Sequence, residues 1–164
     1  MNNLDKKYVI FLDIDGTLMG SDQALKRNIE VIQKVRALGH KVLVNTGRST
    51  ACLPTNIDFE KDFDGVISGA GARVILDGKE IFCKIIQTKD IKKYCAVSFK
   101  EDNVCVLEGI DKILYVGVCA YEHPDWIPIY ESNVDELVND DLEIEKFTVW
   151  GSISEKFAEA FGDE

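Results

Sequence analysis

The sequence predicts an α/β fold in which a parallel sheet in the N-terminal half is followed by a smaller α+β region. The first observation is an unbroken apolar run of β-favouring residues at 8–12, which is typical of a strand covered on both faces. A helical pattern and a second apolar run follow within about 40 residues and complete a right-handed βαβ unit. Charge also changes along the chain, with 8 basic and 5 acidic residues in 1–50 against 11 and 24 in 51–164.

The first helix is predicted over residues 22–38, where apolar side chains recur at helical spacing. Ser21 or Asp22 is available as its N-cap, and Gly39 is placed to end it. The second strand follows directly over Lys41–Asn45. A weaker helical stretch, broken by Pro54, comes after this strand.

A third parallel strand is predicted over Gly65–Ser68, and an antiparallel hairpin follows it. The hairpin strands cover 72–76 and 79–82 and flank Asp77-Gly78, a dipeptide that favours a tight two-residue turn. A hairpin at the edge of a parallel sheet often precedes another domain, so we place a boundary near Cys83. The predicted domains are therefore residues 1–83 and 84–164.

The second region is predicted to be an α+β unit with antiparallel strands. A capping-box pattern at 152–155 marks the start of its last helix. The predicted elements, in chain order, are a helix over 89–99, strands over 104–107 and 113–119, a helix over 134–138, a strand over 144–150 and a helix over 155–161.

The composition of the 164-residue chain excludes several classes of protein. With 46% apolar residues it is too apolar for disorder, and its net charge of −10 argues against nucleic acid or an anionic membrane surface as the main partner. No apolar run is long enough for a signal peptide or a membrane span, so we expect a cytoplasmic protein. Five cysteines without a C-x-x-C pair favour buried reduced thiols over disulfides or a zinc site.

Polar residues follow the first two predicted strands at the point where each strand ends. Asp13-Ile-Asp15-Gly16-Thr17 comes directly after the first strand, and Asn45-Thr46-Gly47-Arg48 ends the second. Ligands of open α/β sheets bind outside the carboxyl ends of the strands, so both segments face the expected crevice. Two carboxylates, a hydroxyl, open backbone amides and a guanidinium at one rim suit a phosphoryl group and a divalent cation.

Each residue type in this pattern has a chemical use. Asp13 is a competent nucleophile toward phosphorus if Mg²⁺, held by carboxylate oxygens and the phosphate, neutralises the repulsion from the phosphate oxygens. Asp15 can protonate the leaving alkoxide and later deprotonate water, and we expect its acidic neighbour to raise its pKa. The groups available to hold phosphate oxygens are Thr46, the amides near Gly16 and Gly47, and Arg48.

These motifs, together with the glycine-containing segment at 65–71 and the hairpin, resemble the haloacid dehalogenase superfamily, specifically its Cof-type phosphatases with a large α/β cap. The resemblance implies a Rossmann-like core in residues 1–83 and an inserted α+β cap in 84–164. It also implies an Mg²⁺-dependent phosphatase in which Asp13 is the nucleophile, Asp15 the general acid and base, and Thr46 a phosphate ligand. Asp13 and the main-chain carbonyl of Asp15 would hold the Mg²⁺.

Members of this family return from the cap to the core and there supply a lysine and an acidic metal loop. Neither is evident before Glu164, since Phe161-Gly-Asp-Glu164 follows a helical pattern and only superficially resembles that loop, so we expect an incomplete core. Two hypotheses stay open. One is a phosphatase of small phosphorylated metabolites, sugar phosphates among them, completed by further residues. The other is a non-catalytic remnant that binds phosphate or Mg²⁺ or associates with another chain, and exposed core surface would favour self-association.

Overall fold

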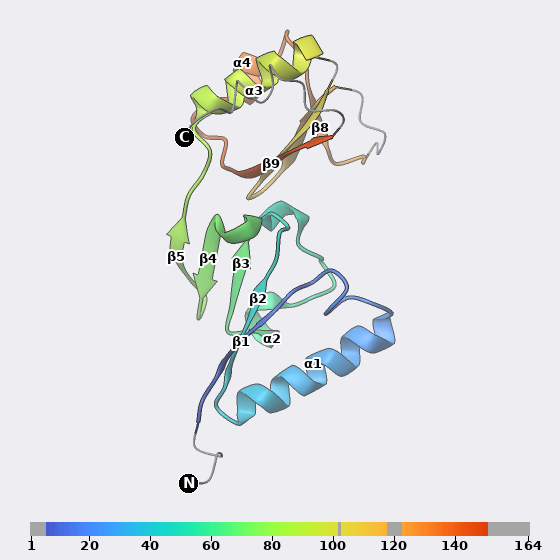
Figure 1. Cartoon of the computed structure of the whole chain (residues 1–164), viewed down its shortest axis with the longest axis vertical. Helices are drawn as coiled ribbons and strands as arrows, with labels where there is room; N and C mark the ends of the chain where they lie inside the picture. The colour runs from blue at the N-terminus through green and yellow to red at the C-terminus, as the bar shows by residue number, and fades with distance from the viewer. Residues whose placement is uncertain (1–5, 102, 118–122, 151–164) are drawn as a thin grey trace. The chain divides into compact units, whose positions relative to one another are not determined.

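The computed structural model describes residues 6–101, 103–117 and 123–150 (Figure 1). The chain forms two compact units, one made of Met1–Arg48 and Leu53–Cys83 and the other of Ser49–Cys52 and Lys84–Glu164. None of the described helices has the length and apolar character that a membrane span requires. The predicted α/β fold class is confirmed.

The first unit is built on a five-stranded sheet with the order β1-β2-β3-β4-β5. Its parallel part consists of β1 (Val9–Leu12), β2 (Lys41–Asn45) and β3 (Gly65–Ser68), as predicted. Helix α1 (Asp22–Ala37) connects β1 to β2 and completes the βαβ unit. The short helix α2 (Phe59–Asp62) lies between Pro54 and β3, where the sequence predicted only a broken helical stretch.

Helix α1 begins at the predicted residue and ends at Ala37, one residue before the predicted end. The Ser21 hydroxyl accepts a hydrogen bond from Ala24 N at 3.3 Å and caps the first turn. After the last turn, Gly39 adopts a φ of +86°, a left-handed conformation that costs glycine little. One face of the helix packs with the sheet in a single apolar cluster, whose buried members are Ile14, Leu18, Ile32, Val42, Val44, Ile57, Phe63 and Val66.

The antiparallel hairpin is also confirmed, with strands β4 (Arg73–Leu76) and β5 (Lys79–Cys83). Asp77 and Gly78 have φ values of +49° and +72°, which is the two-residue turn with two left-handed residues that the Asp-Gly pair favours. The register shifts between Val74 and Ile75, so β5 carries a bulge. Strand β4 pairs with β3 and thereby joins the hairpin to the parallel part of the sheet.

The second unit has a four-stranded sheet with the order β8-β7-β6-β9. Its strands are β6 (Val104–Gly109), β7 (Ile113–Val116), β8 (Ile127–Ile129) and β9 (Ile144–Trp150), and its helices are α3 (Thr88–Glu101) and α4 (Val134–Leu137). The expectation of antiparallel strands throughout is wrong, because β8 pairs with β7 in parallel. Strand β8 was not predicted from the sequence. It contains Pro128 and lies at the sheet edge, the position where a strand tolerates proline.

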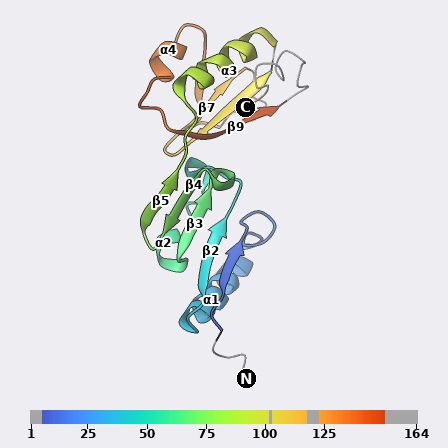
Figure 2. The same ribbon diagram turned by 60° about the vertical axis from the view of Figure 1, so that its left-hand side comes forward.

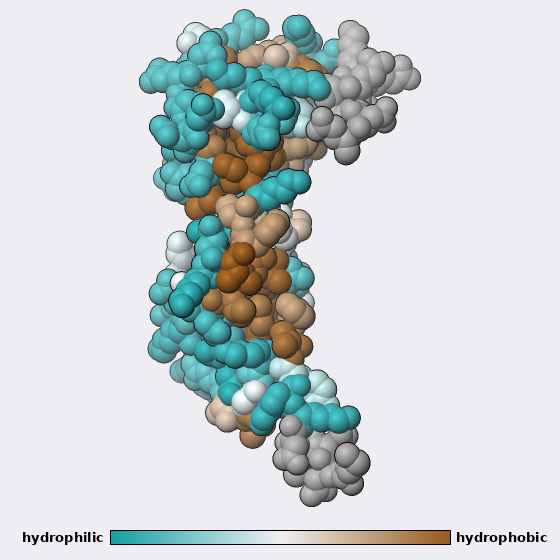
Figure 3. All heavy atoms as spheres, turned by 90° about the vertical axis from the view of Figure 1, so that its left-hand side faces the viewer, coloured by the Kyte–Doolittle hydropathy of each residue, from teal (hydrophilic) through white to brown (hydrophobic). Residues whose placement is uncertain are grey.

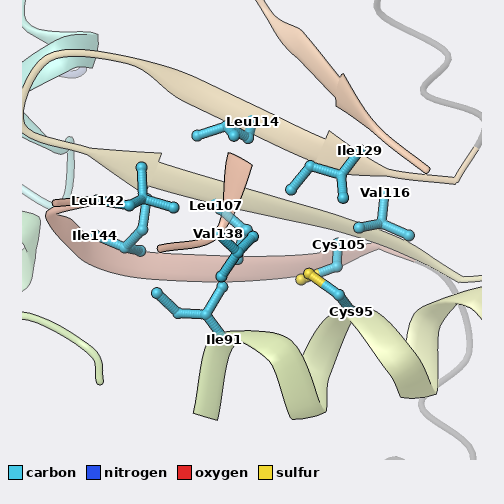
Figure 4. Close-up of a cluster of buried hydrophobic side chains, with 10 residues drawn as sticks. All are labelled: Ile91, Cys95, Cys105, Leu107, Leu114, Val116, Ile129, Val138, Leu142 and Ile144. Atoms are coloured by element: carbon cyan, nitrogen blue, oxygen red, sulfur yellow. The ribbon is translucent and has the colours of Figure 1, made fainter. Parts of the chain in front are cut away.

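The second unit has its own apolar core between α3 and the sheet (Figure 4). Ile91 and Cys95 of α3 meet Cys105 and Leu107 of β6 there, and all four side chains are fully buried. Burial raises the pKa of the Cys95 thiol to about 12 and that of Cys105 to about 11, so both stay protonated at neutral pH. These two cysteines are free and buried, as predicted. Cys83 is free but exposed, so the prediction of burial is wrong for that residue.

Some predicted features fall outside the described residues. These are the helix over 155–161, its capping box at 152–155, and the end of the strand over 113–119. In the described part, β7 ends at Val116, and Gly117 follows with a φ of +89°.

A nearly buried carboxylate, Asp64, joins α1 to the start of β2 in the first unit. It accepts hydrogen bonds from Arg36 Nε at 3.1 Å, Lys41 Nζ at 3.1 Å and Val42 N at 2.9 Å. Partial burial alone would raise the pKa of Asp64, but the bonds from Val42, Lys41 and Arg36 outweigh it and hold that pKa below its ordinary value. The charged form of Asp64 therefore stabilises this unit.

We expect Asp64→Asn to lower the free energy of unfolding by about 1–3 kcal/mol at pH 7, because hydrogen bonds to a charged acceptor are lost. A group with a depressed pKa stabilises the fold above its unfolded pKa, and this contribution disappears as the pH falls through the folded value. The difference between the variant and the wild type should therefore shrink below a pH of about 4 in urea titrations.

The matched control is Asp77→Asn, since the pair that Asp77 makes with Lys41 at 2.8 Å is exposed. A control variant as unstable as Asp64→Asn would contradict the role given to Asp64.

Candidate active site

The first acidic segment forms a tight turn directly after β1. Leu18 N donates to the Asp13 carbonyl at 3.2 Å, and Met19 N donates to the Ile14 carbonyl at 3.0 Å. Ile14 and Leu18 are buried in the core of the first unit, whereas Asp13 and Asp15 are exposed. Burial of the two apolar residues therefore fixes the turn and leaves the two carboxylates in solvent.

Glycine is required in this turn for its backbone conformation. Gly16 has a φ of +74°, which side-chain-bearing residues rarely adopt. The turn allows the chain to leave β1, present Asp15 and return, so that Asp15 and Met19 form an isolated parallel bridge.

The second segment, Thr46–Arg48, follows β2, the neighbour of β1 in the sheet. Thr46 is buried, and its backbone N donates to the Ile67 carbonyl at 2.9 Å. Its hydroxyl oxygen accepts from Arg48 N at 3.2 Å and so fixes the turn. A Cβ at Gly47 would meet nothing within 4 Å, so the space beside its backbone is open.

A third segment, for which no role was predicted from the sequence, supports this turn. Gly69 N donates to the Arg48 carbonyl at 2.7 Å, and Ala70 N donates to the Thr46 carbonyl at 3.2 Å. Gly69, Ala70 and Gly71 all have positive φ values, of 56°, 56° and 101°. The closely spaced glycines after a predicted strand were the available signal, because such a run of left-handed residues favours glycine.

The structure brings Arg48 and Asp15 together across the ends of the two strands. Arg48 Nε donates to Asp15 Oδ2 at 2.9 Å, and Arg48 donates through a second guanidinium nitrogen to Asp15 Oδ1 at 2.8 Å. This two-point geometry is typical of arginine with a carboxylate. Both side chains keep considerable solvent exposure, 36% for Arg48 and 58% for Asp15.

The expected pKa of Asp15 is wrong in direction. From the sequence, an acidic neighbour was expected to raise it, but the hydrogen bonds from Arg48 outweigh the opposing effect of burial and hold the pKa of Asp15 below its ordinary value. Asp15 is therefore ionised at neutral pH in this arrangement. The sequence did not reveal that the guanidinium of the second strand reaches the carboxylate of the first.

Asp13 differs from Asp15 in its surroundings. Within the described part of the chain its carboxylate makes no ion pair and no side-chain hydrogen bond, which leaves its oxygens available to a ligand. No group of three or more metal-ligating side chains occurs among the described residues. Two carboxylates nevertheless fit Mg²⁺, which usually takes one or two from the protein and completes its shell with water and phosphate oxygens.

A family model described as haloacid dehalogenase-like hydrolase matches residues 10–159, nearly the whole chain. The chain belongs to the haloacid dehalogenase-like hydrolases. The match includes both strand-end segments, Asp13–Thr17 and Thr46–Arg48. No curated protein matches the sequence.

Several solved structures share the fold. A phosphatase from Bacteroides thetaiotaomicron, BT1666, is 25% identical with a TM-score of 0.62, and the alignment covers 82% of this chain and 53% of that one. The subclass IIB sugar phosphatase BT4131 is 20% identical with a TM-score of 0.65, covering 88% and 58% of the two chains. TM0651 from Thermotoga maritima is 17% identical with a TM-score of 0.66, covering 96% and 63%.

The chain therefore spans little more than half of the length of the first two solved structures and under two thirds of the third.

We expect Arg48→Ala to raise the pKa of Asp15 toward the ordinary aspartate value of about 3.9, because the two hydrogen bonds that favour the charged form are lost. The measurement is a pH titration of the Asp15 side-chain carboxyl carbon by NMR. As a matched control, Arg73→Ala removes an arginine that pairs with Glu80 at 2.7 Å in the same unit. An unchanged pKa in Arg48→Ala, or an equal shift in the control, would contradict the assignment.

Proposed function

We propose that this chain carries the part of a Mg²⁺-dependent phosphatase that supplies the nucleophile. The enzyme acts on small phosphorylated metabolites through a phospho-aspartate intermediate. The observation that carries the proposal is the pairing of β1 with β2, which sets two carboxylates beside the Thr46–Arg48 turn in a chain of this hydrolase family. In this proposal residues 1–83 are the N-terminal part of the core and residues 84–164 form the cap.

The first step needs a nucleophile and an acid. An Asp13 carboxylate oxygen forms a bond to phosphorus while the bond from phosphorus to the ester oxygen breaks. The leaving oxygen takes a proton from the Asp15 carboxyl group, so the alcohol departs neutral. Asp13 is suited to attack because it is exposed and its oxygens are not engaged by other described residues.

The second step uses the same two residues in new roles. Asp15, now ionised, accepts a proton from water as the water oxygen forms a bond to phosphorus. The bond from phosphorus to the Asp13 oxygen breaks, and inorganic phosphate and the free carboxylate of Asp13 are released. The ionised state that Arg48 favours for Asp15 suits this second step.

The first step requires a protonated Asp15, and Arg48 provides a means to obtain it. A phosphate dianion near Thr46 attracts the same guanidinium, since arginine binds phosphate and carboxylate with the same two-point geometry. As Arg48 moves its hydrogen bonds to the substrate, the pKa of Asp15 rises and protonation becomes easier. Arg48 would then bind the phosphate, and the loss of its hydrogen bonds to Asp15 would allow Asp15 to be protonated as the general acid.

The phosphate oxygens need further hydrogen-bond donors. The Thr46 hydroxyl and the backbone amides beside Gly16 and Gly47 are the available groups, and the absence of side chains at the two glycines permits close approach. Mg²⁺, held by Asp13 and by the carboxyl or carbonyl oxygens of Asp15, would supply charge neutralisation for the approach of an anionic nucleophile to phosphate.

The substrate class is inferred from relatives. BT4131 is a sugar phosphatase, and BT1666 is one of the phosphatases of the superfamily. We therefore propose small phosphorylated metabolites, with sugar phosphates as the first class to test.

A second candidate function is a binding protein that takes phosphate or Mg²⁺ without turnover. Two observations favour it. Among the described residues, no three metal-ligating side chains lie together. In addition, Arg48 favours the ionised form of Asp15, which cannot donate the proton that the first step needs. This candidate predicts binding of phosphate to the chain without release of phosphate from esters.

The experiment that tests this proposal measures Mg²⁺-dependent phosphate release from p-nitrophenyl phosphate and a panel of sugar phosphates. We expect Asp13→Asn to lower the rate by about a thousandfold or more, because the amide cannot form the covalent intermediate. Asp22→Asn is the control, since it removes an exposed charge at the start of α1 in the same unit.

Undiminished release by Asp13→Asn would refute the phosphatase proposal. No release by the wild type, combined with phosphate binding in calorimetry, would support the binding protein instead.

A further inference from the structure

The short segment Ser49–Cys52 directly follows the Thr46–Arg48 turn in the chain but belongs to the second unit. It contains the 3₁₀ helix η2 (Thr50–Cys52). The chain returns to the first unit at Leu53. Arg48 is therefore followed at once by residues that pack with the second unit.

A carboxylate of strand β9 in the second unit holds this segment. Glu145 Oε2 accepts a hydrogen bond from Thr50 N at 2.7 Å, and Glu145 Oε1 accepts one from the Thr50 hydroxyl at 2.6 Å. The two residues are 95 positions apart in the chain. Hydrogen bonds to a charged acceptor are stronger than those to a neutral one, so this contact fixes both the backbone and the side chain of Thr50.

Glu145 differs from the other acidic residues of the second unit in its burial. Hydrophilic side chains cover much of the side of this unit that Figure 3 shows, and Glu143, two residues earlier, is exposed. In contrast, Glu145 is 5% exposed and is the one buried charged residue in the described part of the unit. Burial of a carboxylate is costly unless hydrogen bonds compensate for lost water, and the two bonds from Thr50 do so.

A bulge in β9 sets Glu145 apart from its neighbours. Glu108 and Gly109 are consecutive in β6 but pair with Lys146 and Ile144 of β9, so Glu145 is the extra residue. Ile144 faces the apolar core, on the side of the sheet where Figure 2 shows α3 and α4. A Cβ at Gly109 would come within 2.8 Å of two backbone carbonyl oxygens, so the bulge depends on glycine there. Bulges commonly redirect a side chain near an active site.

We propose that Glu145 is a positioning residue for the Thr46–Arg48 turn, which it holds through Thr50. The inference rests on the proposed function, in which this turn binds phosphate. The first unit fixes the turn itself through the hydrogen bonds of the Arg48 N–H and the Arg48 carbonyl. The contact between Glu145 and Thr50 fixes the chain just beyond the turn, so the backbone of Arg48 is held on both sides.

The Arg48 side chain depends on this backbone. Its guanidinium binds Asp15 at two points in this structure and binds phosphate in the proposed mechanism. Only Ser49, which is fully buried, separates Arg48 from Thr50, so a displacement of Thr50 also displaces Arg48. Loss of the Glu145 carboxylate should therefore disturb Arg48 without removing any group that contacts phosphate.

The first test measures the binding of inorganic phosphate to the 164-residue chain by calorimetry in the presence of Mg²⁺. We expect Glu145→Ala to weaken binding by about tenfold, because both hydrogen bonds to Thr50 are lost. Glu145→Gln should restore binding to within about threefold of the wild type, since an amide can accept from Thr50 N and donate to its hydroxyl. Glu143→Ala is the matched control and should leave binding unchanged.

The second test does not depend on phosphate. The NMR signal of the Arg48 Nε–H group reports its hydrogen bond to Asp15, which is 2.9 Å long in the wild type. We expect this signal to shift in Glu145→Ala and to stay in place in Glu143→Ala, with circular dichroism to check that both variants fold. Thr50→Val removes one of the two donors with little change in volume, and it should shift the signal in the same direction even if Glu145→Ala does not fold.

An unchanged Arg48 signal in Thr50→Val and in folded Glu145→Ala would overturn the positioning role, and so would an equal shift in Glu143→Ala. Lower stability of Glu145→Ala with the Arg48 signal in place would show a purely structural role and would also overturn it. Absence of phosphate binding by the wild type would instead count against the proposed function, and the Arg48 signal would still decide the role of Glu145.

Discussion

The parallel pairing of β1 with β2 is the constraint on which the candidate site depends. The two strands run in the same direction, so their carboxyl ends meet at one edge, and the polar segment after each strand lies beside the other. The buried residues on either side of these segments fix their backbones. Ile14 and Leu18 do this for the first segment, and the buried Thr46, with its bond to Ile67, does it for the second. The chemistry is therefore carried by exposed side chains on a backbone that the core holds in place.

The ion pair between Arg48 and Asp15 shows how one contact can favour one catalytic step over another. An arginine on a carboxylate stabilises the ionised form, which is right for a general base and wrong for a general acid. Phosphate and carboxylate compete for the same guanidinium, so substrate binding and the protonation of Asp15 are linked through Arg48. The same pair also leaves Asp13 as the carboxylate without a partner in the described residues, which suits a nucleophile.

The sequence by itself determined the local elements of the first unit and the residues of the candidate site. Apolar periodicity placed β1, α1 and β2, and residues with special conformations, such as Gly39 and the Asp77-Gly78 pair, marked where elements end, because these signals act over a few residues. It could not reveal the parallel pairing of β8 with β7, since a three-residue strand with a proline gives no pattern. Only the tertiary structure decided that Arg48 reaches Asp15 and lowers its pKa, and that the loop at Gly69 supports the Thr46 turn. Both effects join residues that are far apart in sequence. Hydrogen bonds and charge interactions between such residues depend on their distances in space, which only the folded chain sets.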